Sequence, residues 1–346
     1  MGILSQMYMK HVNIPLPPAG TFKGQAVLIT GGASGLGLAA AAHFVNLGAQ
    51  EVIITSRNAA RASGALSTLE RETQGRSKDV VRVETLDMTS YASVAALSAE
   101  IKKVRAGRGG IDYMILNAGT YGVDFTMAGE GWEQNILVNV LSTVLLGLLL
   151  IPWLKEERAN RATPAHLSVV SSGQHVNPDI GTWATWIPEG VLQHFNKPEN
   201  WPGPIPMYAA TKLMDVYAFD ELSKRALGPD GRPQVIVNTM CPGPVKTDLS
   251  RHFSEKYAAF VVVRTIFTGL FAKSSADGAR TYVAVGLTKE DEHGKFVQFY
   301  QPEGDYKKAA RTNIMSAAGR EMQSQIWTEI TTELSAKVPE VKDILG

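Results

Sequence analysis

The sequence predicts an α/β fold in which seven mainly parallel strands form a doubly wound sheet with helices on both faces. Short apolar runs rich in β-branched residues alternate along the chain with longer helical patterns, as they do in βαβ units. A glycine-rich turn over residues 31–37 joins the first of these runs to an alanine-rich helix. In such sheets ligands bind beyond the carboxyl ends of the strands, so the residues that follow each strand are the candidate functional residues.

The elements follow one another in a regular order. A strand run at 25–30 leads through the glycine turn into a helix at 38–47, and a strand at 51–57 is followed by a polar helix at 59–74. The later strand runs are 80–87, 111–116, 166–170, 234–238 and 295–300, and the later helices are 91–105, 136–154 and one through Tyr208 to about residue 227. We expect a single domain over 1–346, with an N-terminal arm at 1–21 and a C-terminal strand and helices at 276–346.

The composition is that of a globular protein with a sizeable core. Of the 346 residues, 45% are hydrophobic and 19% are charged, and a net charge of +1 gives no electrostatic footprint for nucleic acid. The single cysteine, Cys241, excludes an internal disulfide and a cysteine-rich metal site. We therefore expect no metal and no nucleic-acid partner. Because this cysteine usage suits a reducing compartment and residues 1–10 lack a secretory pattern, we also expect a cytoplasmic protein.

One apolar run is long enough to span a membrane. Residues 136–154 are almost continuously hydrophobic, but Asn139 and Pro152 interrupt them and four charged residues follow at 155–158. A helix that is apolar all round also occurs buried in a large protein or in an interface. Because strand patterns lie on both sides of the run, we expect a buried helix and no membrane span.

Tyr208 and Lys212 are four residues apart, so their side chains share one face of a helix. A phenol has an ordinary pKa near 10 and exchanges protons poorly at neutral pH. An ammonium about 4 Å away, at an effective dielectric near 20, supplies roughly 4 kcal/mol, enough to bring that pKa to about 7. The spacing is what a tyrosine acid/base needs, although a surface helix with a solvated lysine produces the same spacing by chance.

The glycine turn and the end of the second strand indicate a dinucleotide site. Glycines between a strand and a helix let the backbone approach a pyrophosphate, whose charge is stabilised at the helix N-terminus. About 20 residues further on, where NAD-preferring folds place an acidic residue, this chain has Ser56 and Arg57. A guanidinium forms charge-assisted pairs with a 2′-phosphate. We therefore expect NADP(H) rather than NAD(H); the alternatives are a plain tight turn and an exposed arginine.

Five motifs, taken in this order, closely resemble those of the short-chain dehydrogenase/reductase family over residues 22–250. They are Thr30–Gly37, Asn117-Ala118-Gly119, Ser172, Tyr208-x-x-x-Lys212 and Pro242-Gly243. Leu116 stands where the family has a first asparagine. The segments after residue 273 resemble, more narrowly, the retinol-dehydrogenase-like and fungal secondary-metabolism reductases of this family. The resemblance implies a Rossmann-type fold.

The resemblance also implies a role for each matched residue. Tyr208 would be the acid in carbonyl reduction and the base in alcohol oxidation, and Lys212 would lower its pKa and bind the nicotinamide ribose. Ser172 would polarise the substrate carbonyl, since strand alternation points Ser171 to the other side. Asn139 would hold a water in the proton relay, unless it only bends its helix. The implied cofactor-binding residues are Gly31, Ser34, Gly35, Leu36, Gly37, Ser56, Arg57, Asn58, Asp87, Met88, Asn117, Ala118, Gly119, Tyr208, Lys212, Pro242, Gly243, Val245 and Thr247.

Two segments are expected near the substrate. The connection at 173–207 is unusually long for the family and carries Trp183, Trp186 and Trp201; it either walls the substrate pocket or covers the faces through which family members dimerise. Residues 248–275 fall where family members have a substrate lid. Aromatic residues recur there on one helical face, which a stripe of core contacts would also explain. They are Phe253, Tyr257, Phe260, Phe267 and Phe271.

The resulting hypothesis is an NADP(H)-dependent oxidoreductase that interconverts a ketone or aldehyde and an alcohol. Its substrate would be bulky and lipophilic, such as a polyketide or terpenoid, because apolar and aromatic groups line pockets of this kind. A nucleotide-sensing binding protein on the same fold and a dehydratase or epimerase stay open as alternatives, as do a homodimer and a monomer. No carboxylate motif stands beside His175 or His194, so we expect these to be packed or exposed histidines rather than catalysts.

Overall fold

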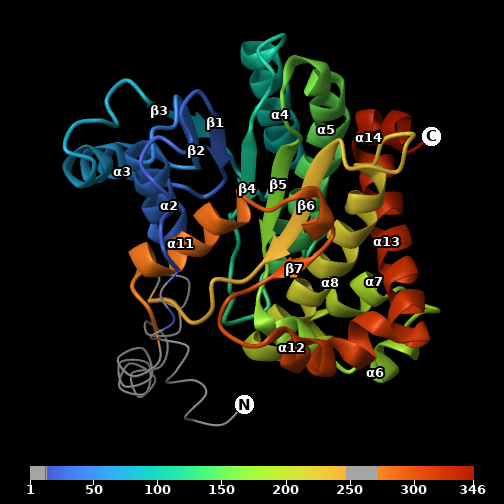
Figure 1. The fold of residues 1–346 in the computed structure, drawn as a ribbon. Helices are drawn as coiled ribbons and strands as arrows, with labels where there is room; N and C mark the ends of the chain where they lie inside the picture. The colour runs from blue at the N-terminus through green and yellow to red at the C-terminus, as the bar shows by residue number, and fades with distance from the viewer. Residues whose placement is uncertain (1–11, 13, 247–271) are drawn as a thin grey trace.

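The computed structural model describes residue 12 and residues 14–246 and 272–346. The seven strands in these residues lie in one sheet in the order β3-β2-β1-β4-β5-β6-β7, and neighbouring strands are parallel throughout. Helices cover both faces of the sheet (Figure 1). The predicted doubly wound α/β fold is therefore confirmed, in a fully parallel form.

The elements lie close to their predicted ranges, except that β7 is much shorter than expected. The strands are β1 (Ala26–Ile29), β2 (Glu51–Ser56), β3 (Val81–Thr85), β4 (Tyr113–Leu116), β5 (Ala165–Val170), β6 (Val235–Met240) and β7 (Phe296–Val297). The main helices are α2 (Gly35–Asn46), α3 (Ala59–Glu72), α4 (Tyr91–Arg105), α5 (Ser142–Glu156), α8 (Pro204–Arg225), α11 (Ser275–Val285), α12 (Glu303–Ala310), α13 (Ala317–Lys337) and α14 (Pro339–Leu345).

Strand β7 ends early because the chain turns directly after it. The side-chain Oε1 of Gln298 accepts hydrogen bonds from the backbone N–H groups of Tyr300 (3.0 Å) and Gln301 (2.9 Å). These bonds satisfy backbone donors that a longer strand would have had to pair in the sheet. The predicted strand at 295–300 was wrong in length, because an apolar pattern does not reveal a local bond between a side chain and the backbone.

Alternate residues of the strands supply two separate apolar cores. Val27 and Ile29 of β1 pack with α2 and α11 on one face of the sheet. Ala26 and Leu28 pack with α4, α5 and α8 on the other face. The sheet is thereby held between two helix layers, which fixes the relative positions of the segments that leave its carboxyl edge.

The long apolar run forms a helix in the centre of the larger core. It begins with a π-helical turn, Ile136–Leu141, and continues as α5. The stretch Ile136–Asn160 is long and apolar enough to cross a membrane, but 94% of its apolar window is buried inside the protein. The prediction of a buried helix is confirmed.

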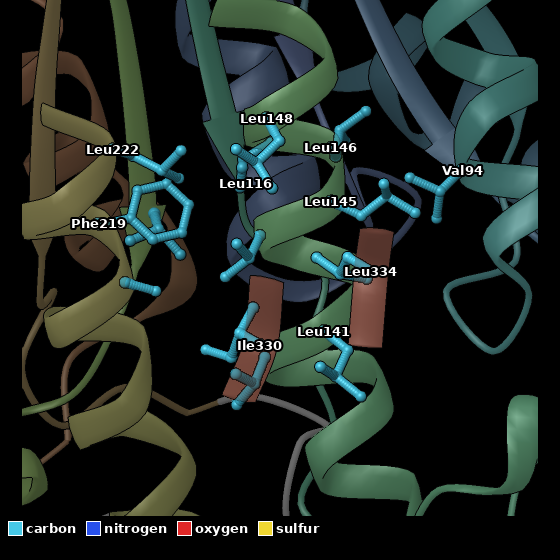
Figure 2. Packing of buried hydrophobic residues seen from close by; sticks show 14 of the residues in the cluster. Val94, Leu116, Leu141, Leu145, Leu146, Leu148, Phe219, Leu222, Ile330 and Leu334 are labelled. Carbon is cyan, nitrogen blue, oxygen red and sulfur yellow. The ribbon is translucent and has the colours of Figure 1, made fainter. Parts of the chain in front are cut away.

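The C-terminal helices add a further layer over α5 and α8 (Figure 1), with α13 against α8 and α14 against α5. Ile330 and Leu334 of α13 belong to the same apolar cluster as Phe219 of α8 (Figure 2). The hydroxyl of Tyr217 on α8 donates to the backbone oxygen of Asn313, just before α13, at 2.7 Å. The helix that carries the predicted catalytic pair therefore depends on the end of the chain for its packing.

Candidate active site

The motifs found in the sequence meet at the carboxyl edge of the sheet. Gly31 follows β1, Asn117 follows β4, Ser172 follows β5 and Pro242 follows β6. These strands are neighbours in the order β1-β4-β5-β6, so segments far apart in the sequence lie side by side. Helix α8 packs against β6 and brings Tyr208 to the same edge.

Tyr208, Lys212 and Ser172 form one cluster. The Nζ of Lys212 lies 5.8 Å from the centre of the Tyr208 ring, and the side chain of Ser172 lies close enough to the phenol to lower its pKa. Ser171 faces the other way, since its hydroxyl donates to the backbone oxygen of Lys212 at 3.1 Å. Strand alternation therefore presents Ser172, and not Ser171, to the phenol.

A carboxylate that the sequence analysis missed completes this cluster. The ammonium of Lys212 donates to Oδ2 of Asp215 at 2.8 Å and to the backbone oxygen of Val170 at 2.9 Å. Lys212 is 5% exposed and Asp215 is fully buried. The signal was present in the sequence, because an acidic residue three positions after a lysine lies on the same helix face.

Burial dominates the acidity of Tyr208. Removal from water raises the pKa of the phenol by more than the charge of Lys212 lowers it, and Ser172 lowers it to a smaller extent. The net shift is upward from the ordinary value of 10.0. The expectation that Lys212 brings this pKa to about 7 is therefore wrong for the groups of the chain itself, because desolvation of the phenolate outweighs the attraction of the ammonium.

Asn139 lies in the π-helical turn before α5, and protein groups occupy its amide. Its Oδ1 accepts a hydrogen bond from the backbone N–H of Thr120 at 2.8 Å. Its Nδ2 donates to the backbone oxygen of Thr120 (3.0 Å) and to the hydroxyl of Thr211 on α8 (3.1 Å). The asparagine ties α8 to the loop after β4, and its suggested role in a proton relay stays a prediction.

The backbone of the glycine turn is open to close approach by a ligand. Gly31 and Gly35 have positive φ angles of 64° and 53°, and a Cβ added at Gly37 would lie 2.7 Å from Nδ2 of Asn117. Asn117 fixes the turn, because its Nδ2 donates to the backbone oxygen of Thr30 at 2.8 Å and its Oδ1 accepts from the hydroxyl of Tyr282 at 2.7 Å.

The N-terminus of α2 behind this turn lacks a side-chain cap. Ser34 occupies the N-cap position in an extended conformation, and its side chain makes no capping hydrogen bond. The first N–H groups of a helix otherwise need a partner, and an anion supplies one. An uncapped helix start behind glycines with positive φ angles fits the pyrophosphate of a dinucleotide.

The end of β2 offers a free cation. Arg57 is exposed, and within the described part of the chain it has no hydrogen-bond or ion-pair partner. The hydroxyl of Ser56 donates to the backbone oxygen of Asn58 at 3.0 Å. After β3, Oδ1 of Asp87 accepts from the backbone N–H of Thr89 at 2.9 Å. The other predicted contacts near the turn lie at the same edge: Leu36, Met88, Ala118 and Gly119.

Asn58, a predicted cofactor contact, caps helix α3. Its Oδ1 accepts from the backbone N–H groups of Ala60 (2.8 Å) and Arg61 (3.1 Å). We expect Asn58→Ala to lower the free energy of unfolding by about 1 kcal/mol, measured by chemical denaturation, with NADPH affinity retained. Asn58→Asp keeps the acceptor and should match the wild type. Weaker NADPH binding at unchanged stability would instead assign Asn58 to the cofactor.

The segment after β6 also lies at the carboxyl edge of the sheet, and the structure describes it as far as residue 246. Gly243 has a positive φ of 79°, and Val245 forms a parallel bridge with Lys273. Thr247 lies outside the described residues, as does most of the predicted lid at 248–275. The aromatic stripe there is outside them too: Phe253, Tyr257, Phe260, Phe267 and Phe271.

The long connection at 173–207 is folded against α13. It contains two short helices, α6 (Ile180–Ala184) and α7 (Val191–Phe195). The backbone N–H groups of Val191 (2.9 Å) and Leu192 (2.8 Å) donate to the carboxylate of Glu329 on α13. At its other end the ring of Trp201 lies edge-on to Phe125, with ring centres 6.1 Å apart.

The two histidines of this connection are packed. His175 is fully buried, its Nδ1 lies 2.7 Å from the backbone oxygen of Ser172, and burial lowers its pKa to about 4. His194 stacks on Trp186 at 3.7 Å between ring centres, and its Nδ1 lies 2.5 Å from a carboxylate oxygen of Glu189, a partner that the sequence analysis did not identify.

Tyr121 is a further site residue that the sequence analysis missed. Its ring lies edge-on to Tyr208 with centres 4.6 Å apart, and burial, followed by the effect of Tyr208, raises its pKa to about 12. Tyr121 stands two residues after the Asn117-Ala118-Gly119 motif, where a strand-end loop enters the site.

Known proteins are similar to this chain in sequence. A family model described as short chain dehydrogenase matches residues 25–175. The short-chain dehydrogenase/reductase phmF of Phaeosphaeria nodorum is 31% identical over 332 residues, which cover 95% of this chain and 92% of that protein. This chain belongs to the short-chain dehydrogenase/reductase family. The short-chain dehydrogenase/reductase ffsI of Aspergillus flavipes is 30% identical over 343 residues, with 99% and 95% coverage. The predicted family is confirmed.

Solved structures share the short-chain dehydrogenase/reductase fold. L-sorbose reductase from Gluconobacter frateurii, complexed with NADPH and L-sorbose, has a TM-score of 0.58 at 20% identity and covers 81% of this chain and 97% of its own. Levodione reductase has a TM-score of 0.58 at 17% identity, with 84% and 99% coverage. As a member of this family, the chain is an oxidoreductase that binds a nicotinamide cofactor.

Proposed function

We propose that this oxidoreductase interconverts a carbonyl and an alcohol with NADP(H), on a bulky lipophilic substrate such as a polyketide or terpenoid. The observation that carries the proposal is the cluster of Tyr208, Lys212 and Ser172 at the sheet edge that also carries the glycine turn. The glycine turn would hold the pyrophosphate of the dinucleotide, whose nicotinamide would supply a hydride to the carbonyl carbon or accept one from the alcohol carbon.

The residues of the chain handle the proton and the charge on the substrate oxygen. The hydroxyl of Ser172 lies close enough to the phenol of Tyr208 to affect its pKa, so a substrate oxygen that reaches both hydroxyls would accept from both as it becomes negative. Because burial raises the pKa of Tyr208, the phenol carries its proton at neutral pH and serves as the acid in reduction. The buried ammonium of Lys212 stabilises the phenolate that forms.

The proposed preference for NADP(H) is supported by Arg57. Its exposed guanidinium follows β2, which pairs with β1 next to the glycine turn, and it has no partner among the residues described. No acidic residue takes its place at the end of this strand. A free guanidinium there suits a 2′-phosphate rather than the ribose hydroxyls of NAD.

The proposed lipophilic substrate is supported by the groups around Tyr208. The ring of Tyr121 contacts Tyr208, and Trp201 with Phe125 forms a second aromatic pair in the segments that lead into the site. Ile205 lies one helical turn before Tyr208 and is 57% exposed. Apolar and aromatic walls with a few polar groups are typical of pockets for such ligands.

The proposal is tested by mixing the protein with NADPH and a panel of lipophilic ketones and aldehydes while following cofactor absorbance. Turnover of at least one compound, with the alcohol identified as product, supports it. Tight NADPH binding without turnover across a broad panel favours the nucleotide-sensing protein. A product that lacks water or has an inverted centre, formed without net cofactor consumption, favours the dehydratase or epimerase.

The proposal includes a cytoplasmic monomer. The helices α13 and α14 cover α5 and α8, so these two buried helices present little apolar surface to a second copy. We expect light scattering after gel filtration to give the mass of one chain at micromolar concentration. A mass of two chains would show that another face forms a dimer.

A further inference from the structure

A buried carboxylate lies directly behind the lysine of the active site. Asp215 is fully buried (0% exposed), and its Oδ2 accepts a hydrogen bond from Nζ of Lys212 at 2.8 Å. The same ammonium donates to the backbone oxygen of Val170 at 2.9 Å. Since an ammonium has three donors, one remains for the side on which Tyr208 lies.

Asp215 acts on Lys212 mainly through its negative charge rather than through a network of hydrogen bonds. The second oxygen of Asp215, Oδ1, is buried and has no hydrogen-bond partner in the described part of the chain. A buried polar group that serves only as scaffold normally has its partners satisfied. The unpaired Oδ1 of Asp215 therefore indicates that this residue acts on Lys212 through its negative charge.

This charge acts on both members of the tyrosine–lysine pair. Burial lowers the pKa of Lys212, but the carboxylate of Asp215, followed by Tyr208, opposes this effect, and the net result is a raised pKa. Burial raises the pKa of Tyr208, and Asp215 adds to the increase by opposing the ammonium. Both effects favour the state in which the pair keeps its two protons.

We propose that Asp215 is a positioning residue that sets the pH above which the Tyr208–Lys212 pair gives up a proton. It holds the ammonium of Lys212 against Val170 and cancels part of the field that this ammonium exerts on the phenol. The inference rests on the proposed function, which assigns the proton transfer to Tyr208.

The other titratable groups that act on the pair are uncharged at neutral pH. Burial raises the pKa of the Cys241 thiol after β6, of the Tyr282 phenol on α11 and of Tyr121, to about 12. Ser172 contributes a hydrogen bond only. Burial raises the pKa of Asp215 itself to about 6, so the carboxylate is ionised over the range in which the pair loses a proton.

The test compares the pH dependence of carbonyl reduction in the wild type and in Asp215→Asn. Asparagine keeps the size and an acceptor oxygen but removes the charge. Losing a negative charge near the pair makes its first deprotonation easier, so the alkaline fall in kcat should move to lower pH by on the order of one unit. At a fixed pH on that limb this is roughly a tenfold lower rate.

Asp220→Asn is the matched control. Asp220 lies on the same helix and faces Gln323 of α13, about 18 Å along the helix axis from Tyr208. The same loss of one charge there should leave the alkaline limb in place. An unchanged or raised midpoint in Asp215→Asn, or an equal shift in Asp220→Asn, would overturn the proposal.

A second measurement does not require turnover. Near-ultraviolet absorbance of tyrosinate, taken as the difference between each protein and its Tyr208→Phe counterpart, reports the ionisation of Tyr208 alone. Its midpoint should fall in Asp215→Asn even if the panel contains no substrate, which separates this inference from the proposed activity. If Asp215→Asn does not fold, Asp215→Glu, which keeps the charge, should retain the wild-type midpoint; a shift there would contradict the role.

Discussion

Tyr208→Phe is expected to abolish carbonyl reduction while NADPH binding is retained. Phenylalanine keeps the ring that packs edge-on against Tyr121 and removes only the phenolic oxygen, on which Ser172 acts. Positioned acid catalysis contributes about 10²–10⁴-fold to a rate, and the variant also lacks one of two donors to the substrate oxygen. We therefore expect a loss at the upper end of this range, measured as NADPH consumption with a substrate of the wild type.

The controls for this prediction are the NADPH affinity and the thermal stability of the Tyr208→Phe variant. NADPH fluorescence titration and the thermal melting curve should match the wild type, because the removed atom contributes to neither the glycine turn nor the apolar cores. A variant that retains more than about a tenth of the wild-type rate would refute general acid catalysis by Tyr208.

Arg57→Ala is expected to weaken NADPH binding by about 10–100-fold and to leave NADH binding nearly unchanged. The guanidinium at the end of β2 has no hydrogen-bond or ion-pair partner among the described residues, so its removal disrupts no such bond within them. A hydrogen bond to a charged group contributes about 1.5–3 kcal/mol, and a bidentate pair with a phosphate lies toward the upper end. The measurement is the dissociation constant of each cofactor by fluorescence.

Arg71→Ala serves as the matched control for Arg57. Arg71 is also exposed but stands in the last turn of α3, at the end of the helix remote from Arg57. Its loss should affect neither cofactor. Equal weakening of NADPH and NADH by Arg57→Ala would show that the arginine contacts a group common to both and not the 2′-phosphate.

The segments that the sequence located well are those set by local chemistry. A strand followed by glycines and a helix has few other structures open to it, so the turn at 31–37 and the neighbouring β1 and α2 were predictable. The face shared by Tyr208 and Lys212 follows from helix periodicity. Strand alternation predicted that Ser171 and Ser172 face opposite sides, and the family resemblance chose Ser172; in the structure Ser171 bonds the backbone of Lys212 while Ser172 acts on the phenol of Tyr208.

The features that could not be predicted from the sequence depend on which side chains the fold buries and brings together. The pKa of Tyr208 was expected to fall, because the attraction of Lys212 can be inferred from spacing but the loss of water around the phenol cannot. Asp215 was overlooked for a related reason: an acid one turn after a lysine is usually a solvated surface pair, and only the packed fold shows it fully buried. Tyr121 reaches Tyr208 through a loop whose path no periodicity encodes.

The covering of α8 by the end of the chain gives the last thirty residues an importance that their chemistry does not suggest. None of them carries a proposed catalytic group, yet Ile330 and Leu334 belong to the same buried apolar cluster as Phe219 of α8 (Figure 2). A premature stop codon ahead of α13 would expose the apolar surface of α8 to solvent. The helix that carries Tyr208 would then lose part of its packing. Truncated gene products of this kind should be inactive and prone to aggregate, although every recognised motif in them would be intact.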